Sequence, residues 1–286
     1  MLMQGTPVES KGSARFQHLP PPWAVFSSAW THRRLILRLA RREVEARYKG
    51  SVLGILWMVL LPLIMVGVYT FVFNIIFHSQ WIIPPGGKGT FSLLVFAGII
   101  WMNLFTECVG RASTLVLSNV SYVKKVVFPL EILPYVLVAA ELVTVFSSSI
   151  VLAIMYLAIL GRPPQTYVWL PVVVAPLFLM TLGWVWLISS LGVFLRDLRH
   201  VVIVLLNLIP FISPLFYQVS VIKEPARRLI YLSPLTVILE QVRAVLFWGQ
   251  QPNWIVWSIY FAVSWLVAWL GLAWFRHAQT GFADVV

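Results

Sequence analysis

Six apolar stretches constrain this chain more than any other feature of its sequence. A helix needs about 20 apolar residues to cross the hydrocarbon core of a bilayer, and a backbone in lipid must satisfy its own hydrogen bonds, as helices and closed barrels do. No ten-residue alternation of apolar and polar residues indicates a barrel. The sequence therefore predicts an all-α integral membrane protein whose six transmembrane helices cover residues 52–77, 91–110, 134–160, 166–195, 201–219 and 254–275.

The composition favours a membrane domain over soluble domains. Of the 286 residues, 60 % are hydrophobic and 11 % are charged, whereas soluble domains carry roughly 25 % charged residues. The first 50 residues hold no apolar run of the signal-peptide type. We expect a cytosolic tail over residues 1–29, a membrane domain over 50–276 and a second cytosolic tail over 277–286. Within the fourth span, Pro171 and Pro176 predict a bend.

The distribution of lysine and arginine predicts the orientation, because cytosolic segments carry an excess of both. With the N-terminus inside and six spans, 15 of the 21 lysines and arginines fall on the cytosolic side. Both termini are therefore expected in the cytosol. The net charge of +11 fits anchoring beside anionic lipids, so membrane lipids rather than nucleic acid are the expected partners.

Residues 30–49 predict an amphipathic helix that lies in the cytosolic interface. One reading is a simple membrane anchor; the other is that the helix also packs beside a cytosolic partner, because it leads into the first span through Gly50. Its candidate site residues are Arg34, Arg38, Arg41, Arg42, Glu45, Arg47 and Lys49.

The stretch SYVKKVVFPLEILP, residues 121–134, lies between the second and third spans. Proline disfavours helical geometry in the preceding residue, so a short cytosolic helix over 121–128 is expected to stop before Pro129. A new helix follows, with Pro129 in its first turn and Glu131 near its positive end. A solvated loop with positive-inside charge is the alternative. The candidate residues are Ser121, Tyr122, Val123, Lys124, Lys125, Val126, Val127, Phe128, Pro129 and Glu131.

A long segment over residues 220–253 is expected on the outer side. Ser233 is a plausible N-cap, Pro234 a first-turn residue and Gly249 a stop, which leaves a helix too short to span. A pair of short re-entrant or interfacial helices over about 224–248 fits better than a seventh span. The arginines of this segment hold lipid phosphates or, in one case, form a pair within the helix; the candidates are Arg227, Arg228, Ser233, Pro234, Glu240 and Arg243.

Two carboxylates fall inside apparent spans, where a lone charge is costly. Glu107 precedes Arg111 by four residues, so a pair on the helix surface is the simple expectation. Glu141 has no partner nearby in sequence; an arginine of the interfacial helix, Arg196 or Arg199 is a candidate partner, and a proton relay is the alternative. Cys108 is the single cysteine, and we expect it to act as a small apolar residue.

Four blocks of the sequence carry a resemblance to a known family. They are RREVEARYKGSVLGILWMVLLPLIMVGVYTFVFNIIF, VKKVVFPLEILP, RDLRH (196–200) and SPLTVILEQVRAVLFWG (233–249). In order and spacing the chain resembles, over about residues 30–276, the permease subunit of polysaccharide-exporting ABC transporters, the Wzm-like family that exports O-antigen, with capsule and teichoic-acid relatives. Ser233 departs from the Asn expected before Pro234.

The resemblance implies roles for the segments. Residues 121–128 would be the coupling helix that docks on a separate ATPase subunit, and the two short outer helices would form a gate. It further implies a homodimer, two ATPase subunits and a channel lined mainly by the first and fifth spans. Aromatic rings stack on sugar faces, so the candidate channel residues are Tyr69, Phe73, Phe211, Phe216 and Tyr217.

The chain itself lacks the sequence features of an ATPase or another enzyme. Its nearest match to a phosphate loop, GGKGT at residues 86–90, has Gly89 where Ser or Thr should follow the lysine. No bound cofactor or metal is expected, and ATP with Mg would be used by the partner. The expected function is export of a lipid-linked polysaccharide across the bacterial inner membrane. Export of teichoic acid, capsule or a small lipid or drug, a proton-coupled flippase and a membrane glycosyltransferase are the alternatives.

Overall fold

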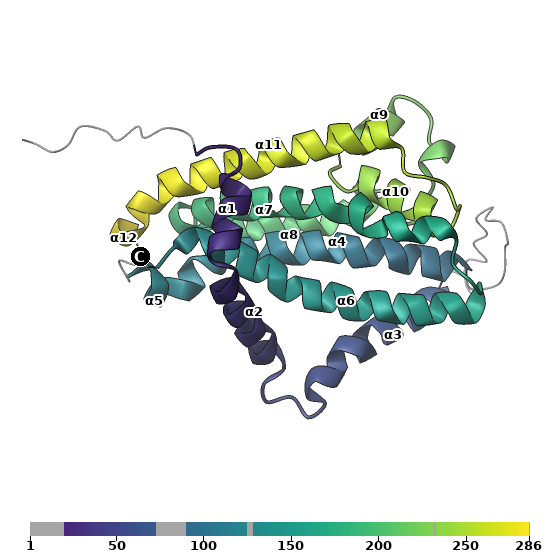
Figure 1. Ribbon diagram of the computed structural model, residues 1–286, viewed down its shortest axis with the longest axis horizontal. Coiled ribbons are helices and arrows are strands. Elements are labelled where there is room, and N and C mark those ends of the chain that lie inside the picture. The colour runs from purple at the N-terminus through teal and green to yellow at the C-terminus, as the bar shows by residue number, and fades with distance from the viewer. Residues whose placement is uncertain (1–19, 73–89, 125–127, 232, 286) are drawn as a thin grey trace, which may run out of the picture.

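The computed structural model describes residues 20–72, 90–124, 128–231 and 233–285. Within these residues all regular elements are helical (Figure 1). The longer helices are α1 (Ala24–Thr31), α2 (Arg33–Tyr48), α3 (Trp57–Thr70), α4 (Thr90–Leu115), α6 (Leu133–Ile159), α7 (Leu170–Phe194), α8 (Leu198–Ile212), α10 (Thr236–Leu246) and α11 (Trp254–Ala278). The short ones are α5 (Val120–Val123), α9 (Ala226–Ile230) and α12 (Phe282–Val285), with 3-10 turns at η1 (Gly54–Leu56), η3 (Leu117–Asn119), η4 (Leu130–Ile132), η5 (Gln165–Trp169), η6 (Val219–Val221) and η7 (Gln279–Gly281).

Four of the described helical segments are long and apolar enough to cross a membrane. They are Thr90–Leu115, Leu130–Ile159, Gln165–Phe194 and Trp254–Gly281. Two shorter apolar helical segments, Gly54–Thr70 and Leu198–Ile212, lie beside them. The chain is therefore a multi-pass, all-helical membrane protein, as the apolar stretches predicted.

The core lies along α4 and α7, which are mostly buried, while the most apolar stretches of α6 and α11 are buried to a smaller extent. Backbones approach closely here. A Cβ on Gly192 of α7 would collide with the backbone of Ser113 in α4, and a Cβ on Gly271 of α11 would collide with the backbone of Gly183 in α7. Glycine at these positions lets α4, α7 and α11 pack backbone to backbone.

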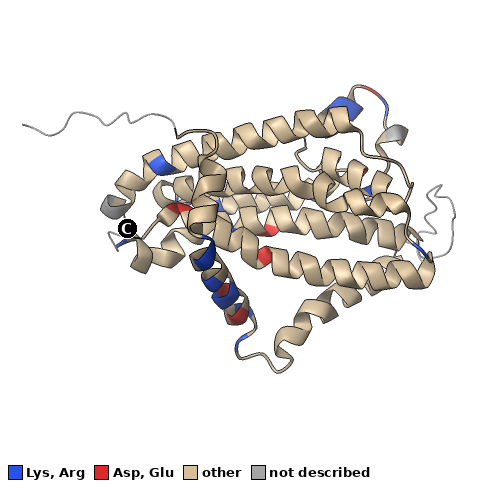
Figure 2. Ribbon diagram, viewed as in Figure 1, with Lys and Arg blue, Asp and Glu red and all other residues tan. Residues whose placement is uncertain are grey.

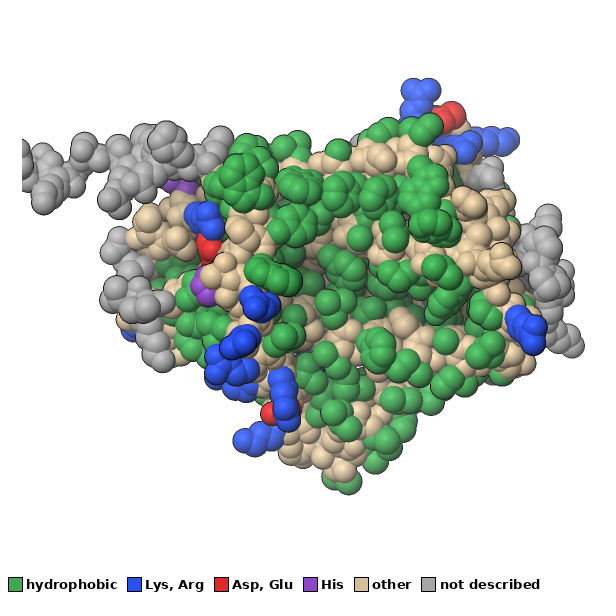
Figure 3. All heavy atoms as spheres, in the orientation of Figure 1, with side chains coloured by type: hydrophobic (Ala, Val, Ile, Leu, Met, Phe, Trp, Pro, Cys, Tyr) green, Lys and Arg blue, Asp and Glu red, His purple; other side chains and the backbone are tan. Residues whose placement is uncertain are grey.

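The two ends of the bundle are built from different elements. In Figure 1, α1, α5 and α12 lie at the end that holds the C-terminus, whereas α9 and α10 lie at the opposite end. Helix α2 slants away from the first end and carries a row of arginines together with Glu43 and Glu45 (Figure 2). Apolar side chains cover much of the long face of the bundle in Figure 3, and the basic side chains gather over α2.

The terminal segments fold further than their description as tails suggested. Helix α1 begins within the predicted N-terminal tail, and the predicted interfacial helix divides at His32 into the end of α1 and all of α2. At the other terminus, α12 returns to the bundle. The ring of Phe282 is fully buried against Phe275 and Phe194, so burial of aromatic surface holds this end in place.

The first and fifth predicted spans differ from expectation. Residues 57–70 form α3, and the rest of the first span from residue 73 lies outside the described residues. Helix α8 ends at Ile212, so the prediction of a helix to residue 219 is wrong. Ser213 is extended (φ −85°, ψ 148°) because Pro214 disfavours the helical conformation in the residue before it. The predicted fourth span is helical without interruption from Leu170 to Phe194, although Pro176 lies inside α7.

Candidate functional site

The segment from Leu117 to Glu131, called the α5 segment below, connects α4 to α6 at the end of the bundle near the C-terminus. Its helix is shorter than predicted. Helix α5 ends at Val123, and Lys124 is a turn residue. Phe128 is not helical, and Pro129 is extended and precedes η4 instead of lying in the first turn of a helix. Lys125, Val126 and Val127 lie outside the described residues.

Two aromatic rings close the α5 segment on itself. Tyr122 and Phe128 stack with their centroids 4.3 Å apart and their planes 10° from parallel. The stack brings Tyr122, at the end of α5, next to Phe128, which precedes η4, so two aromatic rings lie together on the α5 segment.

Arg42 of α2 holds the same tyrosine. Its Nη2 donates a hydrogen bond of 2.8 Å to the Tyr122 hydroxyl, and its Cζ lies 5.9 Å from the centroid of the ring. A guanidinium above an aromatic face is attracted by the ring quadrupole. The interfacial helix and the α5 segment, predicted as separate candidates, therefore contact one another directly.

Helix α2 is anchored to the spans by an apolar face and two ion pairs. Ile36, Ala40 and Val44 are buried. Arg47 Nη1 lies 2.9 Å from Glu141 Oε2 in α6, where the Glu141 side chain is 4 % exposed. Burial of Arg47 opposes its charge, but the nearby Glu141 carboxylate outweighs this and raises the pKa of Arg47. Of the partners considered for Glu141, an arginine of the interfacial helix is the one observed.

The second ion pair joins Arg111 of α4 to Glu43 of α2. The predicted pair of Arg111 with Glu107 is thus wrong, because α2, which packs on α6, brings the Glu43 carboxylate to the guanidinium. Glu107 is exposed. Within the described residues, the Nη1 atom of Arg111 is buried and has no hydrogen-bond partner. Unpaired buried donors are uncommon and call for an explanation.

Glu131 connects three elements at this end of the bundle. Its carboxylate accepts hydrogen bonds from Arg276 of α11 at 2.5 and 3.0 Å and from Ser28 of α1 at 2.5 Å. Its main-chain carbonyl accepts one from Trp186 Nε1 of α7 at 3.1 Å. Glu131 was expected near a helix start, but its partners could not be predicted, because Arg276 lies 145 residues away and no spacing signal relates the two.

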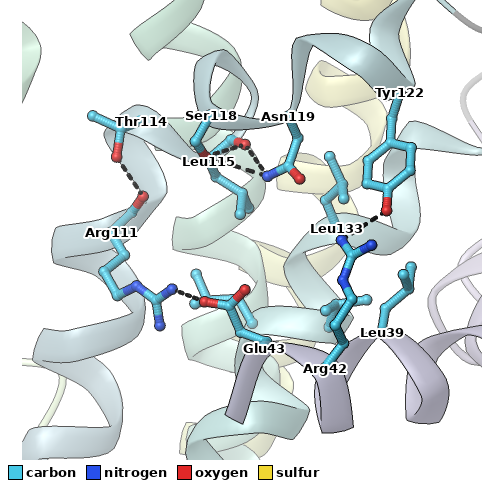
Figure 4. Close-up of a pocket in the computed structure, with 12 residues that line it drawn as sticks. Leu39, Arg42, Glu43, Arg111, Thr114, Leu115, Ser118, Asn119, Tyr122 and Leu133 are labelled. Atoms are coloured by element: carbon cyan, nitrogen blue, oxygen red, sulfur yellow. Dashed lines mark hydrogen bonds and ion pairs between the residues drawn. The ribbon is translucent and has the colours of Figure 1, made fainter. Parts of the chain in front are cut away.

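A pocket of about 240 Å³ lies between α2, the last turn of α4, the α5 segment and the start of α6 (Figure 4). Its polar lining residues are Arg42, Glu43, Arg111, Thr114, Ser118, Asn119 and Tyr122. Its apolar lining residues are Leu39, Leu115, Leu133, Val136 and Leu137. The two guanidiniums come from different helices and are each held by a neighbour, as the dashed lines of Figure 4 show.

The other charged candidates of α2 point to the surface. Arg34, Arg38, Arg41, Glu45 and Lys49 are exposed. Arg41 pairs with Glu45 at 2.7 Å, an exposed i,i+4 pair of the kind that contributes little stability. These residues are therefore available to lipid phosphates or to a partner.

At the opposite end, Arg243 of α10 is fully buried. It donates to the carbonyls of Pro214 at 2.5 Å and Leu215 at 2.7 Å, which follow the end of α8. Glu240 is 3.7 Å away, so the predicted pair is the weaker contact, and lipid phosphate does not reach the guanidinium.

The two short outer helices exist as α9 and α10, and α10 begins at Thr236, later than Ser233 and Pro234 suggested. Ser233 Oγ still accepts from the Leu235 N–H at 3.4 Å and bonds Ser213 Oγ at 2.7 Å. The Pro234 carbonyl accepts a hydrogen bond from Tyr260 of α11. Gly249 adopts a φ of +60° after α10, as expected of a helix stop.

The remaining arginines of this segment are exposed. Arg228 pairs with Glu224 at 3.0 Å, with side chains 84 % and 54 % exposed, and Arg227 is exposed beside it. Both are open to phosphate groups, as one of the two alternatives for this segment required.

The candidate channel residues of the predicted fifth span lie on both sides of the end of α8. Phe211 lies on α8 and is 72 % exposed, whereas Phe216 and Tyr217 follow the helix and are half-buried. The Tyr217 hydroxyl donates to the carbonyls of Phe211 and Ile212 at 3.0 Å each, so it caps α8. Tyr69 is half-buried on α3, and Phe73 lies outside the described residues.

Comparison of the sequence with known protein families identifies the family of this chain. The family model for the ABC-2 type transporter matches residues 34–247. The chain belongs to the ABC-2 type transporter family. The match extends from α2 to the end of α10, so this ABC-2 chain carries the interfacial helix, the α5 segment and the two short outer helices inside the family region.

Curated relatives of this ABC-2 chain are O-antigen export permeases. It is 27 % identical over 259 residues to the O-antigen export system permease protein RfbA of Myxococcus xanthus, covering 90 % of this chain and 97 % of that protein. It is 26 % identical over 254 residues to the protein of the same name from Klebsiella pneumoniae, covering 88 % and 95 %. The predicted resemblance to polysaccharide-exporting permeases is confirmed.

Proposed function

We propose that this ABC-2 chain is the membrane subunit of an ATP-driven exporter that moves a lipid-linked, O-antigen-like polysaccharide from the cytosolic to the outer side of the bacterial inner membrane. The observation that carries the proposal is the match to O-antigen export permeases over nearly the full length of both proteins. A multi-pass helical chain of the ABC-2 family needs a separate ATP-binding subunit for energy, and two copies are proposed here.

The proposed orientation places the α5 end in the cytosol and the α9–α10 end outside, with six spans. The basic residues of α2 support this, because lysine and arginine accumulate on the cytosolic side. Helix α8 has 15 residues and is about 22 Å long, whereas the hydrocarbon core is about 30 Å thick. We propose that α8 is the fifth span and that α10, joined to its end by Arg243, completes the crossing as a gate.

The proposed docking element is the α5 segment, which lies at the cytosolic end in this orientation. ATP binding in the partner subunits would push on residues 121–128. Two contacts support transmission of that push: Arg42 joins the segment to α2, and Glu131 joins it to α11 through Arg276. Residues 50–276 are the proposed membrane domain.

A homodimer with a channel between the protomers is the proposed assembly. Helices α3 and α8 support it, because they expose unusually apolar faces: in α8, Val202 is the buried residue, and the exposed side chains include Val204, Leu205, Leu208 and Phe211. Such apolar helix faces can also be covered by lipid chains. The family resemblance favours contact with a second copy of the chain. Tyr69 and Phe211 remain candidates to stack on sugar rings.

The structure weakens the proton-coupled alternative. A relay needs carboxylates that exchange protons along a path, whereas Glu141 is held by Arg47 in an ion pair. Export of capsule, teichoic acid or a small lipid stays possible within the family, since the fold is shared by exporters of different substrates.

The test uses the genetically adjacent or co-expressed ATPase and a charge reversal at Lys124 and Lys125. In the double variant Lys124→Glu/Lys125→Glu, we expect loss of co-purification with the ATPase and loss of polysaccharide at the cell surface, because the docking side would carry the opposite charge. Arg227→Glu/Arg228→Glu at the other end is the matched control and should keep the complex. Unchanged complex formation and export in the lysine variant would contradict docking through this segment.

A further inference from the structure

The pocket between α2, α4, α6 and the α5 segment has two kinds of wall. One wall is apolar and is formed by leucine and valine side chains of α2, α4 and α6, among them Leu39, Leu115 and Leu137. The other carries two arginines and one glutamate, which leaves one positive charge in excess. A ligand that satisfies both walls has an apolar part and an anionic group.

Both guanidiniums keep hydrogen-bonding capacity for such a group. A guanidinium has five N–H donors; Arg42 contacts Tyr122 through Nη2, and Arg111 contacts Glu43 through Nη2. The buried Nη1 of Arg111 has no acceptor within the described residues. Phosphate oxygens are strong acceptors for paired arginine donors, and the side chains of Asn119 and Ser118 add polar groups at the rim.

The position of the pocket suggests where the ligand comes from. Helix α2 is amphipathic, with buried Ile36, Ala40 and Val44 on one side and exposed arginines on the other, as expected of a helix in the plane of the membrane interface. The pocket lies at the foot of two spans, α4 and α6, next to this helix. In the proposed orientation, this is the depth of the lipid headgroups.

We infer that the pocket binds the phosphate-bearing headgroup of one lipid, with the phosphate between Arg42 and Arg111 and the first carbons of its chains on the leucine wall. This site differs from general attraction of lipids to the exposed arginines of α2, because it has a defined volume and takes one molecule. It rests on the membrane location and on the pocket geometry, and not on which polysaccharide the protein exports.

The experiment measures lipid binding to the purified full chain in detergent by native mass spectrometry, with phosphatidylglycerol and phosphatidylcholine as probes. We expect one phosphatidylglycerol per chain to bind in preference to phosphatidylcholine, whose choline group opposes the arginines. Arg42→Gln and Arg111→Gln should each weaken binding about tenfold, the effect of losing a hydrogen bond to a charged group.

Two further variants separate the pocket from surface charge and from misfolding. Arg38→Gln removes the same charge from an exposed position on α2 that does not line the pocket, and should change binding less than about twofold because surface charges act weakly. Ser118→Trp fills the pocket from an exposed position without changing charge, and should abolish the preferred binding while the melting temperature stays unchanged.

Three results would overturn the inference: equal binding of the two lipids, an equal loss in Arg38→Gln, or preserved binding in Ser118→Trp. A third probe, a polyprenyl diphosphate, distinguishes the two sources of the phosphate. Tighter binding than phosphatidylglycerol assigns the pocket to the carrier lipid of the substrate, and equal or weaker binding assigns it to the bilayer; both support a phosphate headgroup site. Loss of export in cells with unchanged lipid binding would concern the proposed function alone.

Discussion

The two ends of the bundle are held together by different chemistry. At the α5 end, helices are joined by pairs of opposite charge that are partly exposed, such as Glu131 with Arg276, whose side chains are 15 % and 32 % exposed. At the α10 end, one fully buried arginine, Arg243, donates to main-chain carbonyls. Partly exposed ion pairs exchange readily with water, whereas a buried charge that loses its acceptors meets a large desolvation cost. The comparison indicates that the α5 end can rearrange and that the α10 end stays joined.

The largest effect is expected at Arg243. Arg243→Met removes the donor for the carbonyls of Pro214 and Leu215, and leaving buried acceptors unpaired costs about 1–3 kcal/mol for each group. We expect a marked fall in the thermal melting temperature of the purified protein. Arg228→Met, which removes an exposed pair at the same end, is the control and should leave the melting temperature unchanged. Equal melting of the two variants would contradict a structural role for Arg243.

An intermediate effect is expected for the pair of Glu131 and Arg276. Glu131→Arg leaves two positive charges facing one another and should destabilise the chain by about 2 kcal/mol, less than for a fully buried pair because both side chains retain some water. The double variant Glu131→Arg/Arg276→Glu should recover part of the loss. Thermal melting of the single and double variants gives the coupling energy, and strictly additive effects would show that the pair does not interact.

The smallest effect on stability, and a clear effect on function, is expected at Tyr122. Tyr122→Phe keeps the stack on Phe128 and removes the hydroxyl that Arg42 contacts; this hydrogen bond is exposed, so we expect it to contribute no more than about 0.5 kcal/mol. We expect unchanged melting and unchanged assembly with the ATPase, but less polysaccharide exported per ATP hydrolysed. Thr280→Ala, which removes an exposed hydroxyl outside the segment and the pocket, is the control. An unaltered ratio of export to hydrolysis would mean that this contact does not position the α5 segment.

The sequence could predict the elements whose signals are local. Apolar runs predicted the long helices α4, α6, α7 and α11 to within about five residues at each end, and Pro234 with Gly249 predicted the short helix α10. A local signal also gave a wrong prediction. The i,i+4 spacing predicted a pair of Arg111 with Glu107, whereas Arg111 pairs with Glu43, which α2 brings close to it. The end of α8 was missed although Pro214 indicates it, because the apolar run continues past this residue.

Partners far apart in sequence were beyond prediction. Glu131 and Arg276 meet only because α11 returns along α7 to the α5 end, and nothing in their separation of 145 residues reveals it. The same holds for Arg243, which looked like a surface residue of a helix with Glu240 three positions earlier, and which the fold buries against the end of α8. The few charged residues of this mostly apolar chain indicated where functional or structural sites lie, but the partners of these residues could be identified only from the structure.

The loop between α2 and α3 contains two glycines in the left-handed region, Gly50 (φ +85°) and Gly54 (φ +51°), with nothing within 4 Å of where a Cβ would lie. By contrast, α7 approaches both α4 and α11 closely through main-chain atoms. We therefore expect these three helices to move as one unit. Helix α3 therefore follows a linker with two unobstructed glycines, whereas α4, α7 and α11 are held together by close backbone contacts. We therefore expect residues 50–54 to act as the hinge for any movement of α3 away from α4 and α6.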